Sequence, residues 1–377
     1  MAGIYIHIPF CKQACNYCNF YFNTSLRYKD ELTATLKQEL ILRKPFLENE
    51  KIETIYFGGG SPSLLDADEI QKIIDTIHKN YNIGDLKEIT IEANPDDLTE
   101  QKISAFKSTD INRFSIGVQS FFDEDLVWMN RAHNSQQADR AIKAAQDKGF
   151  EKITIDLIYG IPTLSDKNWK FNLDKAIELA IPHISAYGLT VEEKTPLHKL
   201  IKLNKKENVD ESKSAFQMNM LMEALTAKGF EHYEISNFAK PNFYAVHNTN
   251  YWKGVPYLGI GPSAHSYKDN LRNWNVANTQ QYMNGIEEKL PVIENEFLTA
   301  EDIFNEWIMT GLRTQWGCNI AEAKNKFEST WINEMLNEAA LYIANGKLLL
   351  NENILTISKD GKLIADRIMS DLFKSKN

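Results

Sequence analysis

Six short apolar runs alternate with five segments of helical periodicity in the first half of this 377-residue chain. This alternation is typical of a parallel α/β sheet, because a parallel strand is joined to the next by a crossover that is usually a helix. A complete (βα)8 barrel needs eight such units. Six units therefore predict a three-quarter (βα)6 barrel, open on one side. The expected strands are 4–8, 54–57, 88–93, 113–118, 152–159 and 183–189, and the expected helices are 27–43, 66–79, 99–107, 135–148 and 166–179.

Polar motifs follow the predicted strands one after another. In barrels of parallel strands, functional residues come from the C-terminal ends of the strands. Three cysteines follow the first strand, and a glycine triplet follows the second. The next four strands end near Glu92, Gln119, Asp156 and Gly188. We therefore expect these residues to face one shared cavity.

The cysteines after the first strand are Cys11, Cys15 and Cys18. Thiolates select soft metals, either zinc or the iron of an iron–sulfur cluster. A structural zinc site would use a fourth Cys or a His nearby. None is offered, because His7 lies inside the predicted strand and Cys318 is far along the chain. Three ligands suit a [4Fe-4S] cluster that keeps one iron open, and the alternative is a partial zinc knuckle or a chance group of thiols.

The cysteine spacing, with Tyr17 before the last thiol, resembles the signature of the radical SAM superfamily. In that superfamily the open iron binds the amino and carboxylate groups of S-adenosylmethionine (SAM). An electron from the cluster then splits the sulfonium to give a 5'-deoxyadenosyl radical. The triplet 58–60 resembles the superfamily's glycine motif, which meets the methionyl amino group. By itself such a triplet is more often an ordinary turn, although glycine does let backbone approach a ligand closely.

Longer motifs at 5–11, 57–63, 115–120, 130–131 and 156–162 together resemble the oxygen-independent coproporphyrinogen III oxidase family of radical SAM proteins. The resemblance covers nearly the whole chain. It implies SAM-binding roles for Tyr5, Tyr17, Gly59, Gly60, Ser61, Glu92, Gln119, Arg131, Asp156 and Gly188. The residues alone leave a second explanation open, because buried carboxylates need partners. Glu92 and Asp156 could be structural partners of Arg113 or Arg131.

Two features depart from the true oxidases. Those enzymes carry a fourth cysteine where this chain has Phe20, and an extension before the first strand, which here begins almost at Met1. Both departures resemble the paralogous HemW-type heme chaperones, which also carry a His-Asn-x-x-Tyr-Trp motif, found here at 247–252. Histidine can ligate heme iron, and Tyr and Trp offer flat faces to a porphyrin. The resemblance thus implies heme-binding roles for His247, Tyr251 and Trp252; a satisfied His in an aromatic loop over the barrel mouth is the alternative.

The resemblance implies a protein that binds heme and transfers it to acceptor hemoproteins, carrying a [4Fe-4S] cluster and SAM. The rival is coproporphyrinogen III oxidation, in which the radical abstracts a propionate hydrogen and decarboxylation follows. A radical SAM enzyme with another substrate is a third interpretation. The residues do not identify the heme donor or acceptor, nor whether heme is held covalently.

The chain divides into three parts. We expect the barrel in 1–236, an Asn-, Gly- and aromatic-rich segment of little periodicity in 237–290, and a helical module in 291–377. The last part resembles a winged helix, because a short hairpin is expected between its helices. The further expected helices are 211–228, 300–311, 320–326 and 331–345, with a strand at 230–235.

Composition limits the class of partner. The net charge of -9 argues against a nucleic-acid surface. Four cysteines with three in one loop make no disulfide framework, which indicates a reducing compartment. No stretch approaches the roughly 20 apolar residues of a membrane helix. We therefore expect a cytoplasmic protein, and the sequence leaves peripheral membrane contact and homodimer formation open.

Overall fold

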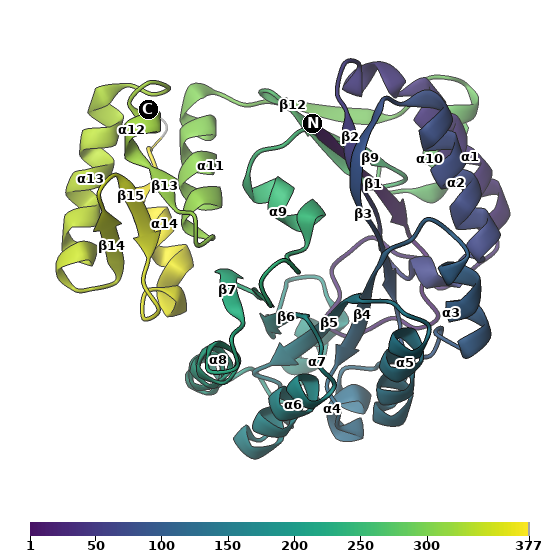
Figure 1. Ribbon diagram of the computed structural model, residues 1–377, viewed down its shortest axis with the longest axis horizontal. Helices are drawn as coiled ribbons and strands as arrows, with labels where there is room; N and C mark the ends of the chain where they lie inside the picture. Colours follow the sequence, from purple (N-terminus) through teal and green to yellow (C-terminus); the bar gives the residue numbers. More distant parts are fainter. Residues whose placement is uncertain (376–377) are drawn as a thin grey trace.

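The computed structural model describes residues 1–375. It contains a 12-stranded sheet that curls into an open barrel, and a C-terminal module with its own 3-stranded sheet (Figure 1). The strand order in the large sheet is β12-β11-β10-β9-β1-β2-β3-β4-β5-β6-β8-β7. None of the helices in residues 1–375 combines the length and apolar character needed to cross a bilayer.

The six predicted strands form the centre of the large sheet, each parallel to the next. They are β1 (Ala2–Ile8), β2 (Ile52–Gly59), β3 (Ile83–Ala93), β4 (Arg113–Gln119), β5 (Lys152–Tyr159) and β6 (His183–Gly188). All seven residues of β4 are buried, as expected for a parallel strand that is covered on both faces. The predicted three-quarter barrel is therefore confirmed.

Helices cover the outer face of this sheet (Figure 1). They are α1 (Lys29–Leu42), α2 (Ala67–Asn80), α3 (Glu100–Lys107), α4 (Asp123–Trp128), α5 (Ser135–Asp147), α6 (Asp166–Glu178), α7 (Pro196–Lys202) and α8 (Glu211–Thr226). In α2, Asp66 and Glu69 form a capping box, and Ile70, Ile73 and Ile77 lie on the buried face. Helices α4 and α7, of six and seven residues, are too short to show a periodic pattern, and neither was predicted from the sequence.

The segment 237–290, whose sequence shows little periodicity, contains regular helices and strands. It contains β8 (Asn237–Ala239), α9 (Val246–Trp252), β9 (Tyr257–Ile260), β10 (His265–Lys268), β11 (Leu271–Asn275) and α10 (Thr279–Glu287). Together with β7 (Glu231–Glu234) and β12 (Ile293–Phe297), these strands extend both edges of the barrel sheet. Each strand has three to five residues, which is too short to show alternation. Helix α9 joins the two edges and packs against β2 and β3.

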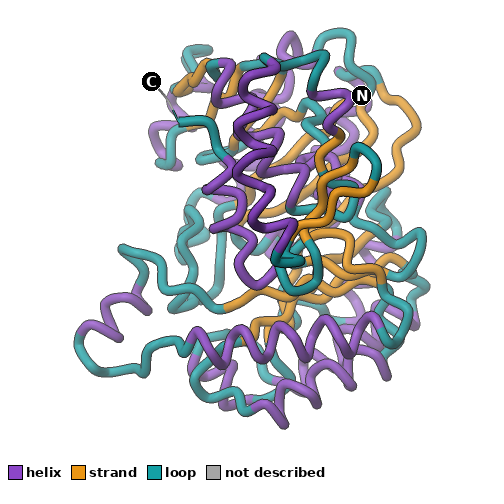
Figure 2. The backbone as a smooth tube through the Cα atoms, turned by 90° about the vertical axis from the view of Figure 1, so that its left-hand side faces the viewer, coloured by secondary structure: helices purple, strands orange, loops and turns teal. Residues whose placement is uncertain are grey.

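The C-terminal module has a separate hydrophobic core. It comprises α11 (Ala300–Leu312), β13 (Cys318–Asn319), α12 (Ile320–Ala323), α13 (Ser329–Ala344), β14 (Leu348–Asn351), β15 (Ile354–Ile357) and α14 (Ala365–Leu372). The antiparallel β14–β15 hairpin lies between helices, as the sequence predicts. Figure 2 shows the module's helices in front of the strands of the large sheet.

Candidate functional site

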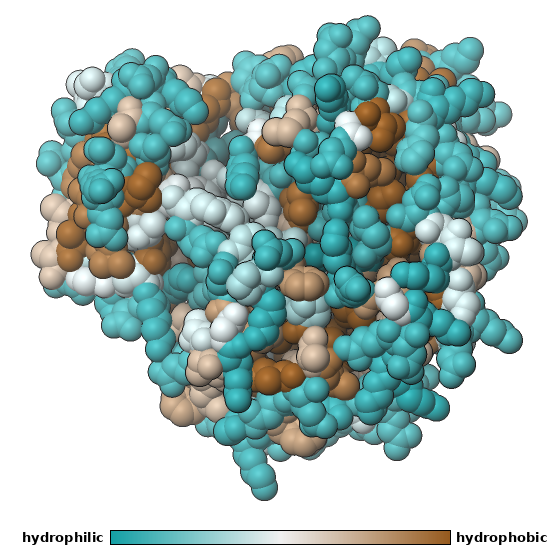
Figure 3. Space-filling model, viewed as in Figure 1, coloured by the Kyte–Doolittle hydropathy of each residue, from teal (hydrophilic) through white to brown (hydrophobic). Residues whose placement is uncertain are grey.

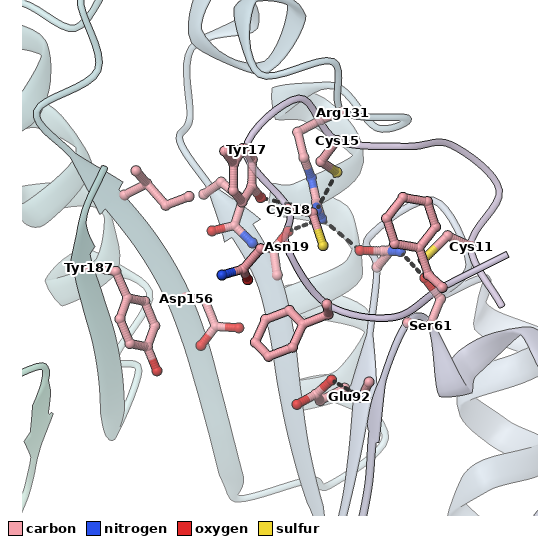
Figure 4. A pocket seen from close by; sticks show the side chains of 18 of the residues that line it. Cys11, Cys15, Tyr17, Cys18, Asn19, Ser61, Glu92, Arg131, Asp156 and Tyr187 are labelled. Atoms are coloured by element: carbon pink, nitrogen blue, oxygen red, sulfur yellow. Dashed lines mark hydrogen bonds between the residues drawn. The ribbon is translucent and has the colours of Figure 1, made fainter. Parts of the chain in front are cut away.

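A first cavity of about 430 Å³ lies at the C-terminal ends of the central strands. Figure 4 shows the cysteine loop and Arg131 on one side of it, with Glu92, Asp156 and Tyr187 facing them. Nearly all the residues predicted to hold the cluster and SAM line this cavity. They are Cys11, Cys15, Tyr17, Cys18, Gly59, Gly60, Ser61, Glu92, Gln119, Arg131, Asp156 and Gly188. The residues expected at the strand ends therefore share one cavity, as predicted, and Arg131 and Tyr17, which the resemblance assigned, line it as well.

Tyr5 is the predicted SAM-binding residue that does not line this cavity. Its hydroxyl lies 3.1 Å from Nδ1 of His7, and its ring stacks on Tyr56 with 6.0 Å between centroids. Successive side chains of a strand point to opposite faces of the sheet, so Tyr5 and His7, two residues apart in β1, lie on the same face. A SAM-binding role for Tyr5 stays a prediction that the arrangement of its side chain does not support.

The cysteine loop is held to the rest of the barrel by side-chain amides. Asn130 donates to the carbonyl of Ala14 at 2.7 Å, and Asn16 donates to that of Trp128 at 3.1 Å. Burial raises the pKa of the Cys11 thiol to about 12, and it also raises the pKa of Cys18. A buried thiolate without compensating positive charge is costly, and iron supplies such charge.

The donor set suits a cluster. Within residues 1–375, no three His, Cys, Asp or Glu side chains converge tightly enough to hold a single metal ion. A four-iron cluster does not require this convergence, because each thiolate binds a different iron. Arg131 adds positive charge, since its Nη1 lies 3.4 Å from Sγ of Cys15. Three thiols and a guanidinium therefore fit an anionic iron–sulfur group.

Arg131 is fixed by neutral acceptors rather than by a carboxylate. Its Nη2 donates to Oδ1 of Asn94 at 2.6 Å and to the carbonyl of Gly117 at 2.8 Å. Its buried Nε has no partner within the described chain. Neither Glu92 nor Asp156 pairs with Arg131, so the structural alternative considered for these two carboxylates is not observed.

The glycine turn after β2 provides a close approach to backbone. Gly59 has φ +109°, and a Cβ on it would lie 2.5 Å from the ring of His7. A Cβ on Gly60 would lie 2.6 Å from the carbonyl oxygen of Phe10. No larger residue fits at either position without displacing its neighbours. Close packing against His7 and Phe10 therefore requires glycine at both positions, and the turn that they form lines the cavity.

Two carboxylates give the cavity its electrostatic character. Glu92 accepts hydrogen bonds from the Tyr56 hydroxyl at 2.8 Å and from the Gly59 amide at 3.1 Å. Burial raises its pKa above the ordinary value. Burial, followed by repulsion from Glu92, raises the pKa of Asp156 to about 7. Among the described residues no cationic side chain forms an ion pair with Glu92 or Asp156, and such an acidic pair fits a ligand that carries positive charge, such as a sulfonium or an ammonium group.

We expect the stability of the ligand-free protein to respond to Asp156→Asn in a pH-dependent way. Between the ordinary Asp pKa and about 7, the folded state holds a proton that the unfolded state has lost. Stability contributed by this group therefore falls as pH rises through that window. The Asn variant should gain Tm relative to wild type as pH rises from about 5 to about 8. A pH-independent difference would contradict this reasoning, and exposed Asp174→Asn is the control.

Several residues of the cavity were not predicted to function in it. Asn94 donates to Oγ of Ser61 at 2.6 Å while it accepts from Arg131, so it links two predicted site residues. Tyr187 lies at the C-terminal end of β6, Thr190 and Glu192 follow that strand, and all three line the same cavity. Their position at or just after a strand end was the signal in the sequence that could have identified them.

His247 lies away from the first cavity. Its side chain is buried, with Nδ1 2.8 Å from the Thr54 hydroxyl and Nε2 2.9 Å from the Tyr251 hydroxyl. Its ring stacks on Tyr56 with 5.1 Å between centroids. Burial lowers its pKa to about 3, so the imidazole is neutral and both nitrogens are occupied. In this arrangement His247 offers no free nitrogen to an iron.

A buried ion pair holds the start of α9. The carboxylate of Glu88 accepts from the amides of Val246 at 2.8 Å and His247 at 3.1 Å. It also lies 3.6 Å from Nη1 of Arg113, which donates to the carbonyl of Phe243 at 3.2 Å. Arg113 thus pairs with Glu88, not with the cavity carboxylates. The pair fixes the segment that carries His247.

Tyr251 and Trp252 line a second cavity of about 650 Å³. Its walls come from α9, from strands β9 to β11, and from α11 with the loop that follows it. The residues of the predicted heme-binding motif therefore lie in two environments: His247 is buried, whereas Tyr251 and Trp252 line the second cavity.

Comparisons with known proteins agree with this architecture. The model of the radical SAM superfamily matches residues 5–176, and that of the HemN C-terminal domain matches residues 298–364. Heme chaperone HemW of Bacillus subtilis is 32% identical over 98% of both chains. Heme chaperone HemW of Lactococcus lactis is 32% identical over 92% of this chain and 90% of its own.

Among solved structures, coproporphyrinogen III oxidase (HemN) of Escherichia coli, described as a radical SAM enzyme, superposes with a TM-score of 0.86. The match covers 99% of this chain and 90% of that chain at 20% identity. At this identity the likeness shows a shared fold.

Proposed function

Because this chain belongs to the HemW family of radical SAM proteins, we propose that it binds heme and transfers it to acceptor hemoproteins. The observation that carries the proposal is the match to the curated HemW chaperones, which extends over 98% of both chains in the Bacillus subtilis relative. A match of that extent includes the C-terminal module as well as the barrel.

The first cavity would hold a [4Fe-4S] cluster and SAM. Cys11, Cys15 and Cys18 would each bind one iron and leave the fourth open to the amino acid part of SAM. When bound, the cluster supplies an electron to the sulfonium. The protein's own contribution is positioning: the glycine turn meets the ligand with backbone, and Glu92 and Asp156 place negative charge opposite a cationic ligand.

Phe20 supports a chaperone over an oxidase. It stands where the resemblance places a fourth cysteine in the oxidases, and its side chain is 68% exposed at the first cavity. A phenyl group supplies neither a proton nor an electron, so a thiol-dependent step at that position is lost. The rival function, coproporphyrinogen III oxidation, would have to proceed without that group.

One preparation tests both functions. After anaerobic reconstitution, the protein is titrated with heme while absorbance is recorded, and a second portion is incubated with coproporphyrinogen III, SAM and a reductant. Stoichiometric heme binding without decarboxylation supports the proposal. Decarboxylation of the porphyrinogen would replace it with the enzymatic alternative, and absence of heme binding would remove it.

Heme ligation by His247 stays a prediction, and it requires one ring nitrogen to give up its hydrogen bond, either to Thr54 or to Tyr251. For the arrangement seen, we propose that His247 positions Tyr251 instead. His247→Ala is then expected to weaken heme binding while the Soret band of bound heme keeps its wavelength. A shifted band that returns on addition of free imidazole would show that His247 is a ligand.

A further inference from the structure

Helix α11 forms one side of the second cavity, and two of its faces make different contacts. Phe304, Ile308 and Leu312 of α11 pack into the core of the C-terminal module. Ile303, Trp307 and Thr310 recur at helical spacing on another face, and they line the cavity. Figure 3 shows pale residues in the hollow between the C-terminal module, at the left, and the barrel. Trp307 packs against Phe304 and Phe327 of the module, with 5.7 and 5.6 Å between ring centroids, and it also lines the cavity.

Large aromatic side chains dominate the lining. Trp252 comes from α9, Trp307 from α11, Trp316 from the loop after α11, and Tyr257 and Tyr267 from β9 and β10. All five are only partly buried. Aromatic rings supply large, flat apolar faces, and their arrangement around one cavity of about 650 Å³ favours a flat aromatic ligand.

Basic side chains line the same cavity, although the chain as a whole is acidic. Lys253, Arg272 and Lys326 contribute positive charge, and Glu306 is the single acidic residue among the lining residues. Arg272 bonds to Glu306 at 2.6 Å, which joins β11 to α11 across the cavity. Lys253 lies 4.6 Å from the ring centroid of Trp316. The cavity therefore combines aromatic surface with groups that pair with carboxylates.

A series of contacting side chains, Tyr251, His247 and Tyr56, links the second cavity to Glu92 in the first. Tyr251 lines the second cavity, and its hydroxyl bonds to Nε2 of His247. The His247 ring stacks on Tyr56, whose hydroxyl donates to Glu92 in the first cavity. His247 thus acts on the second cavity through Tyr251, and not by direct contact.

From this placement we infer that the second cavity is the tetrapyrrole site. The macrocycle packs between the tryptophan and tyrosine rings, and its two carboxylates face Arg272 and Lys253. The inference rests on the proposed function, since it names where the heme of that function is held. It makes His247 a positioning residue of the site, and it places the ligand between α9 and the C-terminal module.

The test uses the full-length protein, titrated with hemin, with iron-free protoporphyrin IX and with the dimethyl ester of that porphyrin. Trp307→Ala removes a wall of the cavity, and Thr310→Trp fills the cavity from the next turn of α11. Each is expected to weaken hemin binding about tenfold or more. Iron-free protoporphyrin IX should bind like hemin, and its dimethyl ester about tenfold more weakly, because the ester removes both charges.

Trp128→Ala is the matched control, since this partly buried tryptophan lies beside Lys206, outside the second cavity. It is expected to bind hemin as wild type does. Hemin binding that is unchanged in both Thr310→Trp and Arg272→Gln would overturn the inference while leaving the proposed function standing. An equal loss in Trp128→Ala would also overturn it. Wild-type protein that binds no hemin would instead remove the proposed function.

Thermal unfolding of each variant shows whether it folds. If Trp307→Ala fails to fold, Thr310→Trp and Arg272→Gln decide the question, because neither removes a core side chain. His247→Phe keeps a ring against Tyr56 but leaves the hydroxyls of Thr54 and Tyr251 without their shared partner, so both Tm and hemin affinity should fall. Thr54→Val loses only the bond on the far side of the ring. A larger loss of hemin affinity in His247→Phe than in Thr54→Val, at comparable Tm, is the readout that a merely structural role would not move.

Discussion

A Cys15→Ser variant is expected to lose nearly all the iron–sulfur absorbance that the wild-type protein gains on anaerobic reconstitution. Serine keeps the size of the side chain but replaces a soft thiolate with a hard hydroxyl, which iron in such clusters binds poorly. Arg131 would also lose the sulfur that lies 3.4 Å from its Nη1. Iron and sulfide analysis of the reconstituted variant measures the loss directly.

Cys318→Ala is the matched control for this experiment. Its thiol is buried in the C-terminal module, within hydrogen-bond range of the carbonyl of Trp307. It should take up as much iron as wild type, because it lies in a different hydrophobic core from the cysteine loop. Full iron content in Cys15→Ser, or an equal loss in Cys318→Ala, would refute the assignment of the three ligands.

Glu88→Ala is expected to lower the free energy of unfolding by about 3–5 kcal/mol. The substitution leaves Arg113 charged and buried without its partner, and both side chains are at most 2% exposed in the native state. It also removes the acceptor for the amides of Val246 and His247 at the start of α9. Urea unfolding, followed by circular dichroism, measures the change.

The control for this variant is an ion pair that is exposed to water instead of buried. Lys170 and Asp174 lie one helical turn apart in α6, and both are more than half exposed. Asp174→Ala should cost about 0–1 kcal/mol, because water screens the pair and solvates what remains. If Glu88→Ala unfolds at the same urea concentration as Asp174→Ala, the buried pair does not hold α9 as we describe.

Much of the first cavity was predictable because parallel strands share a direction. Their C-terminal ends meet at one edge, so residues such as Gly60, Glu92 and Asp156 could be grouped without knowing any contact. The SAM-binding role of Tyr5 came from the resemblance instead, and it stays a prediction: Tyr5 lies on β1 with its hydroxyl 3.1 Å from Nδ1 of His7. Periodicity does not tell which face of β1 meets a ligand, because residues on both faces of this strand are buried.

Short elements and buried charges were harder to predict. Strands β8 to β11 have three to five residues, which is too short to show alternation, so the sequence carried no signal for them. Arg113 was considered as a partner for Glu92 or Asp156, yet it pairs with Glu88. All three acidic side chains lie in strands, Glu88 and Glu92 in β3 and Asp156 in β5. Arg113 is the first residue of β4 and lies opposite Thr90 of β3, so the choice among the three depends on position along the strands and on where α9 packs. The sequence pattern gives neither.

The amino-acid sequence by itself determined the barrel, the cysteine loop and the strand-end residues of the first cavity, because these follow from local periodicity and from the common direction of parallel strands. The place of Arg131 and Tyr17 in that cavity was instead implied by the family resemblance. Only the tertiary structure decided that His247 is enclosed and that Tyr251 and Trp252 face a second cavity with Trp307. Those residues come from α9 and α11, which are far apart along the chain. Their meeting depends on how the C-terminal module packs against α9 and the strands at the barrel's edge, and no local pattern encodes that packing.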